Sequence, residues 1–358
     1  MNKKVRVLYF YATWSPFIAK DVEILETKYE VLIFQFNPKH KLYTIITFLS
    51  QILFLSKNLF ESKLFVSQFG GLHSFLPAFF SKVFSTPSIL IAGGTDCVSF
   101  PLLAYGNLRP GMLGTFTKLS HKLSTYIVPV DESLIYNKYN YKNPHANFTE
   151  QGIKAFIPQL KSHTQVVYNG YDDIAKNYPY SKKKSSFITI ASGISSMSRY
   201  QLKGIDLFIE MAVNMPTSTF IVIGADTLPE KYPANVQLIP FMDSTELIKH
   251  LLETEYYVQL SISEGFPNAL CEAMVCSCMP IVTNVGAMPY IVQENGITIS
   301  EKNVNVILKK LKAVSTEQIP IIAQNARESI LTRFPLERRK KELLLLCDQV
   351  IAGKQIIN

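Results

Sequence analysis

Two glutamates, Glu264 and Glu272, are separated by seven residues in the stretch EGFPNALCE. If Glu264 ends a buried strand and Glu272 lies on the following helix, both carboxylates face one cleft, with backbone N–H groups of the turn between them. Carboxylates accept hydrogen bonds from hydroxyls, and free N–H groups at a helix start bind phosphate oxygens. The stretch therefore suits a sugar nucleotide, which offers both kinds of group.

The turn between the glutamates supports this interpretation. Gly265 permits close backbone approach, and Pro267 suits the first position of a helix. We expect Glu272 to accept both hydroxyls of a ribose and Glu264 to accept hydroxyls of a transferred sugar. The alternative is a Glu272 that faces solvent on the helix surface. The backbone amides expected to point at phosphate oxygens are those of Phe266, Asn268 and Ala269.

A second loop carries cations. The stretch ITIASGISSMSRYQLKGIDLFIEMA, residues 188–212, reads as a strand, a turn at Gly193, a serine-rich loop with Arg199 and Lys203, and a helix after Gly204. Cations four positions apart before a helix start hold a diphosphate between their charges and the amides of the first turn. The competing interpretation is that Arg199 and Lys203 are solvated surface residues.

Apolar runs alternate with amphipathic segments along the chain, which is the β-α-β-α pattern of parallel sheets. There are enough strands for two sheets, and we place the domain boundary near residue 165. Because ligands bind at the carboxyl ends of parallel strands, the loops that follow strands are where the candidate residues belong. The predicted strands are residues 5–11, 30–36, 63–67, 88–92, 126–130, 165–168, 187–191, 219–223, 235–239, 256–261 and 279–283.

Composition and charge limit the possible classes. The 358 residues, 47% of them hydrophobic, suffice for two domain cores. Residues 1–160 hold 16 Lys and Arg against 9 Asp and Glu, whereas residues 161–358 hold 20 against 19. A basic first half is typical of a lobe that faces an anionic partner such as a phospholipid surface, although surplus lysines also serve solubility alone. Nucleic-acid binding is the weakest alternative, because no lysines are interleaved with aromatic residues in a known module.

The cysteines and histidines show no spacing typical of metal ligands. The 5 cysteines form no regular framework, and the chain contains neither H-x-x-x-H nor D-x-D. We expect no metal site, and reduced, buried cysteines in a cytoplasmic protein. The opening MNKKVRVLYFYATW reads as a first buried strand rather than a signal peptide, because its apolar run is short and no small-residue cleavage site follows.

The most apolar helical candidate is residues 42–60, LYTIITFLSQILFLSKNLF. Polar residues interrupt the run, so an amphipathic helix is favoured over a membrane span. We predict that its apolar face packs in the core, and a face that lies on a membrane is the alternative. This face consists of Leu42, Ile45, Ile46, Leu49, Ile52, Leu53 and Phe60.

Together with the preceding strand and the segment MPIVTNVGAMPYIVQENGI that follows, EGFPNALCE resembles the E-x7-E motif of the family 4 retaining glycosyltransferases. The resemblance covers most of the chain and is most specific in residues 255–297. It implies an α/β GT-B fold, in which two Rossmann-like, doubly wound parallel-sheet domains face each other across a deep cleft. The implied divisions are an acceptor-binding domain at 1–165, a nucleotide-sugar-binding domain at 166–335 and a helix at 336–358 that crosses back to the first domain.

The resemblance also implies roles for the matching residues. Glu264 would contact the donor sugar and Glu272 the ribose, while Arg199 and Lys203 would hold the diphosphate without a metal ion or other cofactor. Glu264, Arg199 and Lys203 are therefore the predicted catalytic residues, in a front-face transfer with retention. The family's arginine directly after the glycine of the strand turn is replaced here by Ile194, which makes Lys203 the firmer assignment.

The first half matches the family more loosely. LIAGGTDCVSFP resembles the family's H-G-x-D strand end, with Gly93 in the histidine position. Asp96 is predicted to orient the acceptor or the donor sugar, and capping of the following turn is the alternative. The first loop, YATWSPFIAKD, lacks the family's glycines, and its Trp14 is a candidate either to stack on an acceptor sugar or to sit in the core or at the rim. Asn169, in VVYNGYD, is expected to shape the cleft floor.

The predicted partners are a nucleotide-sugar donor and a glycan or lipid-linked glycan acceptor. The basic first half and the apolar helix suit a lipid-diphosphate-linked glycan at the inner face of a bacterial membrane, in synthesis of capsule, exopolysaccharide or lipopolysaccharide. The protein would then be cytoplasmic and peripheral on an anionic membrane. Two rivals stay open: a degenerate transferase that binds donor without turnover, and a sugar-nucleotide epimerase on the same fold.

Overall fold

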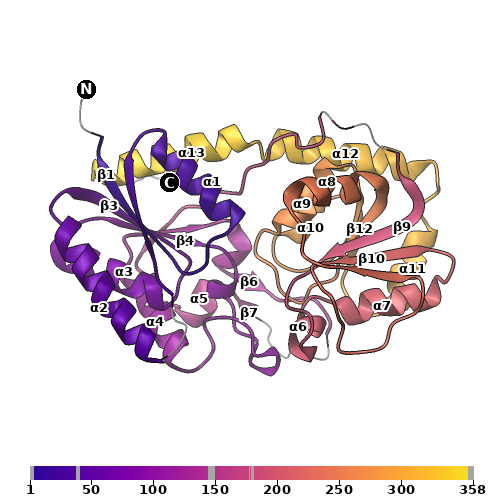
Figure 1. Cartoon of the computed structure of the whole chain (residues 1–358), viewed down its shortest axis with the longest axis horizontal. Coiled ribbons are helices and arrows are strands. Elements are labelled where there is room, and N and C mark those ends of the chain that lie inside the picture. Colours follow the sequence, from indigo (N-terminus) through magenta and orange to yellow (C-terminus); the bar gives the residue numbers. More distant parts are fainter. Residues whose placement is uncertain (1–3, 38–40, 144–149, 177, 179–180, 354–358) are drawn as a thin grey trace.

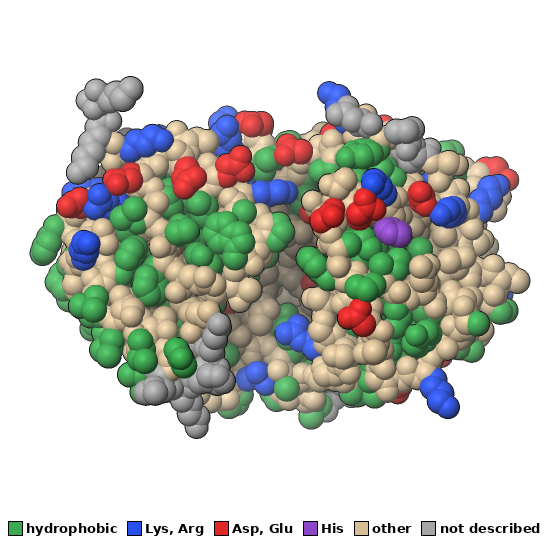
Figure 2. Space-filling model, in the orientation of Figure 1, with side chains coloured by type: hydrophobic (Ala, Val, Ile, Leu, Met, Phe, Trp, Pro, Cys, Tyr) green, Lys and Arg blue, Asp and Glu red, His purple; other side chains and the backbone are tan. Residues whose placement is uncertain are grey.

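The computed structural model describes residues 4–37, 41–143, 150–176, 178 and 181–353 of the chain. The chain forms two halves, each built on a parallel sheet with helices on both faces (Figure 1). A space-filling view shows a hollow between the two halves (Figure 2). The predicted α/β class with two parallel sheets is confirmed.

The first sheet has six strands in the order β2-β1-β3-β4-β5-β8. Its strands β1 and β4 are almost wholly buried apolar runs, as expected of parallel strands covered on both faces. The elements of this half are β1 Arg6–Tyr11, α1 Pro16–Glu26, β2 Glu30–Gln35, α2 Lys41–Asn58, β3 Ser62–Gln68, α3 Leu72–Phe84, β4 Ser88–Ala92, η1 Thr95–Cys97, η2 Pro101–Leu103, α4 Met112–Leu123, β5 Tyr126–Pro129, η3 Glu132–Leu134, β6 Asn137–Lys138, β7 Glu150–Gln151, α5 Ile153–Phe156 and β8 His163–Thr164.

The second sheet also has six strands, in the order β11-β10-β9-β12-β13-β14. All its pairings are parallel, and β9 and β12 lie at its centre. The elements of this half are β9 Lys183–Ile190, α6 Met197–Leu202, α7 Ile205–Asn214, β10 Thr219–Ile223, β11 Val236–Ile239, α8 Ser244–Glu253, β12 Thr254–Gln259, α9 Asn268–Val275, β13 Met279–Thr283, α10 Met288–Val292, β14 Ile297–Ile299, α11 Val304–Lys312, α12 Gln318–Arg333 and α13 Leu336–Ile351.

The predicted strands overlap observed ones with one exception. Instead of the strand expected at 165–168, the structure has the short strand β8 at His163–Thr164. Beyond β8 the chain continues beside β5, with the N–H groups of Gln165 and Val167 donating to carbonyl oxygens of β5. The short strand β14 is not indicated by the sequence pattern. The first sheet thus ends at residue 164 and the second begins at residue 183.

Helix α13 follows the second half in sequence but packs on the first. Its Arg339 forms two bonds of 2.7 Å to the Asp21 carboxylate of α1, and both side chains are buried. The hydroxyl of Tyr29 donates to Asp348 Oδ1 at 2.8 Å. Figure 1 shows α13, in yellow, beside α1. These contacts attach the end of the described chain to the first half.

The predicted core face of α2 is wrong. Leu53 and Ile45 are 71% and 59% exposed, and Ile46, Leu49, Ile52 and Phe60 are exposed as well, while the side chain of Leu42 lies outside the described residues. The helix instead buries the opposite side: Leu55, with Leu59 just after the helix, packs in the cluster of the sheet, and the Gln51 amide donates to the His73 carbonyl oxygen of α3 at 2.7 Å. Because α2 is apolar on nearly all sides, its periodicity does not identify the inner face. Aromatic packing selects it, since Phe54 contacts Phe10 and Phe34 of the strands.

Two further predictions concern cysteines and membrane spans. All five cysteines are free and buried, as expected. Over the described ranges, no helix combines the length and the apolar character needed to cross a membrane.

Candidate functional site

Lys203 and Glu264 form an ion pair at the carboxyl edge of the second sheet. The Lys203 Nζ lies 2.7 Å from Glu264 Oε1. Lys203 follows α6 and Glu264 follows β12, so the pair joins the two loops that the sequence singles out. Gly204 makes this approach possible: it has a φ of +68°, and a Cβ there would lie 2.0 Å from the carbonyl oxygen of Leu260.

Each member of this pair stabilises the charge of the other. Burial raises the pKa of Glu264, but the Lys203 ammonium, together with hydrogen bonds from Ser261 and Gln259, outweighs burial and holds this pKa below its ordinary value. Burial also disfavours the Lys203 ammonium, and the Glu264 carboxylate again prevails, so the pKa of Lys203 is raised. Both groups are therefore charged near neutral pH, and an incoming diphosphate would compete with Glu264 for Lys203.

Arg199 lies beside this pair and contacts the first half of the molecule. Its guanidinium carbon is 5.6 Å from the ring centroid of Tyr105, in the loop after η2. The neighbouring Ser198 hydroxyl donates to the carbonyl oxygen of Leu103. The hydroxyl of Ser196 caps the start of α6 by accepting from the Arg199 N–H at 3.4 Å. A loop of the first half thus meets the cationic helix of the second.

The two residues of the glycine turn after β9 point in different directions. Gly193 has a φ of +69°, and a Cβ there would meet no described atom within 4 Å, so its backbone faces open space. Ile194 is fully buried in the core of the second domain. A side chain at position 194 is therefore directed away from the cleft, which leaves Arg199 and Lys203 as the cations of this loop.

The turn formed by Glu264, Gly265 and Phe266 packs directly against the first half. A Cβ at Gly265 would lie 2.2 Å from the carbonyl oxygen of Gly93, and one at Gly94 would lie 3.2 Å from Gly265. The glycine at position 265 is therefore needed for contact between the two domains. The close backbone approach that the sequence indicates at Gly265 is made here with the loop after β4.

Asp96 holds the loop after β4 through hydrogen bonds to its backbone. Its carboxylate is fully buried and accepts backbone N–H bonds from Gly70 at 2.8 Å and from Gly93 and Gly94 at 3.1 Å each. Its backbone carbonyl oxygen lies 3.0 Å from Nε2 of His121, a buried residue of α4. Asp96 thus has no exposed surface in this structure, and the N–H groups that it binds precede it in the chain, so it holds the Gly70 and Gly93–Gly94 loops rather than capping the following turn.

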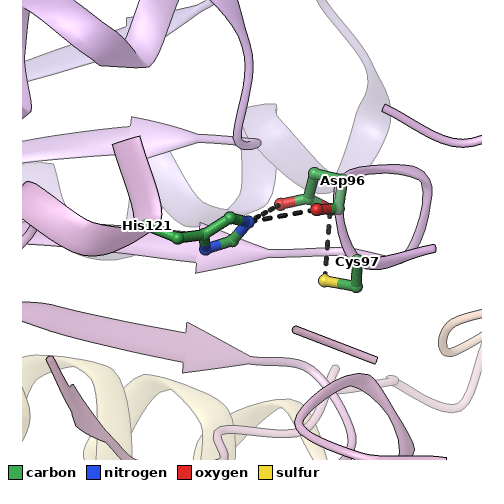
Figure 3. Close-up of side chains that lie close together, drawn as sticks. All are labelled: Asp96, Cys97 and His121. Carbon is green, nitrogen blue, oxygen red and sulfur yellow. Dashed lines mark hydrogen bonds and ion pairs between the residues drawn. The ribbon is translucent and has the colours of Figure 1, made fainter. Parts of the chain in front are cut away.

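Asp96, Cys97 and His121 lie close enough together to hold a metal ion (Figure 3). The chemistry of these three side chains fits a structural role better than metal binding. Burial raises the pKa of the Cys97 thiol well above its ordinary value, so the sulfur is a thiol that donates to Asp96 rather than a thiolate ligand. Three N–H groups already occupy the carboxylate of Asp96.

Aromatic residues occupy the places where the first half departs from the family pattern. A Cβ at Gly93 would lie 1.9 Å from the ring of Phe69, so that ring fills the space of a side chain at position 93. Phe69 also packs on Phe17 of α1, with ring centroids 5.4 Å apart. Trp14 is 47% exposed in the loop after β1 and contacts Tyr11 edge-on, which places it on the surface rather than in the core.

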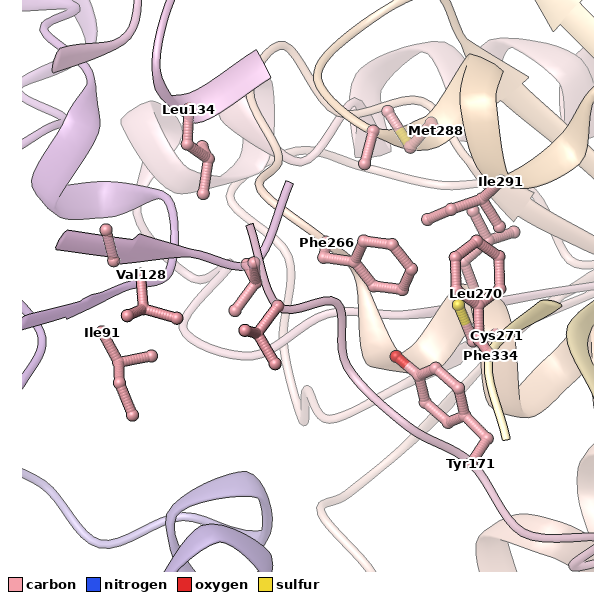
Figure 4. Close-up of a cluster of buried hydrophobic side chains, with 14 of the residues drawn as sticks. Ile91, Val128, Leu134, Tyr171, Phe266, Leu270, Cys271, Met288, Ile291 and Phe334 are labelled. Carbon is pink, nitrogen blue, oxygen red and sulfur yellow. The ribbon is translucent and has the colours of Figure 1, made fainter. Parts of the chain in front are cut away.

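Helix α9 begins at Asn268, one residue later than expected, with Pro267 as its N-cap. The ring of Phe266 is buried among Tyr171, Phe334 and other apolar side chains (Figure 4). Only the backbone of Phe266 is thus left for a phosphate. The Asn268 side chain is also engaged, because its Oδ1 accepts from Asn169 at 3.0 Å and from the Tyr171 hydroxyl at 2.6 Å. Ala269, in the first turn, is half-buried.

Glu272 faces a different part of the interface from Glu264. It lines a cavity of about 20 Å³ with Lys20 of α1, Asn169 and Asn268. Glu264 lines another, of about 10 Å³, with Ser133 and Tyr139 of the first half. Burial raises the pKa of Glu272, and the Lys20 ammonium partly counters that rise. Cavities of this size hold about one water molecule.

Sequence reasoning missed Tyr105, Lys20 and Phe69. Tyr105 contacts Arg199 across the cleft, Lys20 faces Glu272, and Phe69 fills the space beside Gly93. Position gives one signal, because Phe69 directly follows β3, and loops after parallel strands are where ligands bind. Tyr105 and Lys20 are 94 and 252 residues from their partners in sequence, so no local spacing reveals them.

The arrangement brings two cations, a carboxylate and a helix start to one interdomain surface. Cations and helix-start amides stabilise a departing diphosphate, and a carboxylate accepts sugar hydroxyls. The Asp96 cluster and the Phe266 ring serve the structure around that surface. The roles of the predicted site residues stay predictions.

Sequence comparison relates the second half of the chain to a known family. Residues 193–330 match the family of glycosyl transferases group 1. No curated protein matches the chain in sequence. The matched segment contains Lys203, Glu264 and Glu272.

Solved structures share the fold over nearly the whole chain. Sucrose-phosphate synthase from Thermosynechococcus elongatus superposes with a TM-score of 0.69 at 12% identity, over 98% of this chain and 100% of that one. A glycosyltransferase from Rickettsia africae gives 0.67 at 13% identity, over 99% and 100%. HepE from Anabaena, in complex with UDP, gives 0.65 at 13% identity, over 96% and 100%. These similarities establish a GT-B fold of two Rossmann-like domains.

Proposed function

We propose that the protein is a retaining glycosyltransferase that moves a sugar from a nucleoside-diphosphate sugar to a glycan or lipid-linked glycan. The observation that carries this proposal is the Lys203–Glu264 pair, which lies at the interdomain surface within the segment that matches group 1 glycosyltransferases. An ion pair at the carboxyl edge of a sheet offers a cation to a diphosphate and a carboxylate to a sugar.

Donor binding would exchange the partners of this pair. The diphosphate takes Lys203 and Arg199 together with the amides at the start of α9, and the freed Glu264 accepts hydroxyls of the sugar. Glu272 accepts the ribose hydroxyls from the other side of the turn. The free energy lost by separating Lys203 from Glu264 is offset because each charge gains a new partner of opposite or polar character.

The chemical step follows from the charge that develops. The bond between the anomeric carbon and the diphosphate oxygen breaks, and the acceptor oxygen bonds to that carbon from the same face. The departing phosphate takes the acceptor proton. Lys203, Arg199 and the α9 amides hold the negative charge on the leaving group, in the role that a metal ion fills in other transferases. We therefore propose a metal-independent reaction of the family 4 type.

A UDP-sugar is the first donor to test, because HepE from Anabaena has been solved with UDP and with UDP-glucose. For the acceptor, we propose a lipid-linked glycan in cell-surface polysaccharide synthesis, handled at the cytoplasmic face of the membrane. The basic composition of residues 1–160 supports this assignment.

A binding protein that retains the donor site without turnover is the second candidate. The ring of Phe69 favours it, since that ring replaces a side chain at position 93, where the family carries histidine. Transfer or hydrolysis of a donor by the protein, lost in the Glu264→Gln variant, would exclude this candidate.

Thermal stabilisation by a panel of UDP-, GDP-, ADP- and TDP-sugars is the first experiment. A ligand that binds only the folded state raises the melting temperature, by an amount that grows with its concentration relative to Kd. We expect one nucleotide class to stabilise the protein, with the shift lost in Glu272→Gln and kept in Glu253→Gln, a matched exposed glutamate. No shift with any donor would overturn the proposal.

Product analysis then tests the mechanism. With the donor identified, NMR of the anomeric proton would show the donor's configuration in the product, and EDTA would leave the rate unchanged. An inverted product contradicts the retaining mechanism, and loss of activity in EDTA contradicts metal independence. Free hexose of altered stereochemistry, formed without acceptor, would indicate an epimerase instead.

A further inference from the structure

Three neighbouring helices of the first domain expose apolar side chains on their outer sides. Of the 26 large hydrophobic side chains exposed in the described part of the chain, 13 lie on α2, α3 and α4 or directly after α2. We call this surface the α2–α4 face. Its members are Tyr43, Ile45, Ile46, Leu49, Ile52, Leu53, Phe60, Phe79, Val83, Phe84, Met112, Leu113 and Leu119.

The three helices form one layer, so their outer sides make a continuous surface. Phe116 of α4 contacts Phe48 of α2, with ring centroids 6.0 Å apart, and Phe75 of α3, at 4.9 Å. These inner rings fix the helices side by side. Figure 1 shows the layer along the lower side of the first domain. An apolar surface of this extent is unusual for a protein face that meets only water.

The charge of the same segment is one-sided. Residues 41–123, from the start of α2 to the end of α4, contain seven Lys and Arg and only two acidic residues. Of these two acids, Asp96 is fully buried, and Glu61, which is 56% exposed, is paired with Arg6 at 2.7 Å. Lys57, Lys82 and Lys122, by contrast, are exposed. On the face that Figure 2 shows, the acidic side chains visible on this domain lie in its upper part.

We propose that the α2–α4 face docks on an anionic phospholipid membrane. Apolar side chains on one face of a helix insert between headgroups, and lysines around them are attracted to anionic lipid, so the two contributions combine. A second copy of this chain is a poorer occupant, because two such faces would bring their lysines together. A membrane supplies the opposite charge and an apolar phase at the same time.

The face also leads to the proposed reaction site, and to that extent its purpose rests on the proposed function. Helix α3 begins at Leu72, directly after the Gly70–Gly71 loop held by Asp96. Helix α4 begins at Met112, 67% exposed, after the loop that carries Tyr105. The N-terminal ends of α3 and α4 therefore lie next to the interdomain surface that carries Arg199 and Lys203, so the α2–α4 face continues to that surface. A lipid-linked acceptor would reach the cleft along this side.

Vesicle co-sedimentation of the full chain tests the proposal. We expect binding to vesicles of phosphatidylglycerol and phosphatidylcholine at low salt, at least tenfold weaker binding to phosphatidylcholine alone, and a steep decrease with added NaCl. The triple variant Ile45→Gln, Leu49→Gln, Leu53→Gln should lower binding at least tenfold. Glutamine keeps helix propensity, so the helix itself should persist.

A matched triple variant controls for the loss of any exposed apolar side chains. Val213→Gln, Ile321→Gln and Leu345→Gln remove three side chains of comparable exposure on α7, α12 and α13, and binding should stay at the wild-type level. A second arm, Lys57→Gln, Lys82→Gln and Lys122→Gln, should weaken binding to anionic vesicles several-fold and flatten its salt dependence.

The outcomes separate this proposal from the proposed function. Absence of binding to anionic vesicles at low salt would overturn it, as would equal losses in the two apolar triple variants. Self-association in sedimentation velocity that the α2 triple variant abolishes, without vesicle binding, would assign the face to a second copy instead. Melting temperature and donor-induced stabilisation, measured on the same variants, should be unchanged, because they report folding and donor binding rather than docking.

Discussion

The two domains place their charged and polar groups in opposite ways. In the second domain, Lys203 and Glu264 lie in loops after strands and form an ion pair at the interdomain surface, with side chains that are 25% and 12% exposed. In the first domain, Asp96 is just as polar but fully buried, and its carboxylate accepts bonds from three backbone N–H groups and from the Cys97 thiol. In the proposed reaction, charged groups of the second domain therefore serve recognition, whereas the charged group of the first domain holds the shape of a loop.

This difference predicts which measurements respond to substitution. A group that a ligand engages should change kinetics with little change in stability. A group that holds a loop should change stability first and kinetics only through the loop. Matched variants in the two domains test this division, beginning with the group expected to have the largest effect.

Lys203→Gln should lower kcat/KM about 1,000-fold, roughly 4 kcal/mol, because the leaving diphosphate loses a cation in the transition state. The glutamine amide can still donate to Glu264, so the melting temperature should change little. Steady-state kinetics with the identified donor, together with calorimetry, measure both effects. Lys183→Gln is the control, because Lys183 forms a comparable pair with Glu253 at 2.6 Å on an exposed surface.

Asp96→Ala should have the converse effect. The substitution leaves the buried N–H groups of Gly70, Gly93 and Gly94 without their acceptor, and we expect a loss of about 3 kcal/mol in the free energy of unfolding. Urea denaturation measures this loss. A stable Asp96→Ala variant with abolished turnover would break the comparison, since it would make Asp96 a residue of the reaction.

The buried histidine of α3 gives the first domain a pH dependence. Burial lowers the pKa of His73 from 6.5 to about 4, and its Nε2 lies 2.9 Å from the carbonyl oxygen of Gln68. Because the folded pKa is lowered, the stabilisation is complete above pH 6.5 and decreases as pH falls toward 4. At pH 5 the loss should be about 2 kcal/mol.

Urea denaturation of wild type and His73→Gln at pH 7 and pH 5 tests this dependence. The variant removes the titrating group, so the difference between its two unfolding free energies should be smaller than that of wild type by about 2 kcal/mol. Equal differences in the two proteins would contradict the assignment to His73.

The second domain was more predictable from sequence because its site is encoded locally. The turn at residues 264–272 combines a glycine and a helix start within a few positions, and the structure places both there; the preceding strand β12 ends at Gln259, earlier than the expected end at Glu264. The prediction was wrong for α2, whose residues are apolar on nearly every side. Which side is buried depends on aromatic rings of the strands, such as Phe10 and Phe34, that the helix meets only after folding.

Long-range partners were the other part that sequence reasoning missed. The ion pair between Arg339 and Asp21 joins residues 318 positions apart, and the pattern of neither segment indicates the other. The separation of Glu264 and Glu272 into two cavities has a similar cause, since the loop of the first domain that contacts Gly265 determines it. Local pattern thus identifies the elements and their loops, whereas contacts between domains require the folded chain.

Tyr105 gives the smallest effect and connects the two domains. Its ring holds the Arg199 guanidinium at 5.6 Å, a cation–π contact of about 1 kcal/mol. Tyr105→Ala should therefore raise the KM for the donor about fivefold and leave kcat nearly unchanged, because Arg199 is no longer held beside the cleft. Tyr105→Phe keeps the ring and should stay near wild type. If Tyr105→Phe raises KM as much as Tyr105→Ala, the hydrogen bond between the Tyr105 hydroxyl and Thr95 determines the effect. Tyr105 would then act by holding the shape of its loop, as Asp96 does.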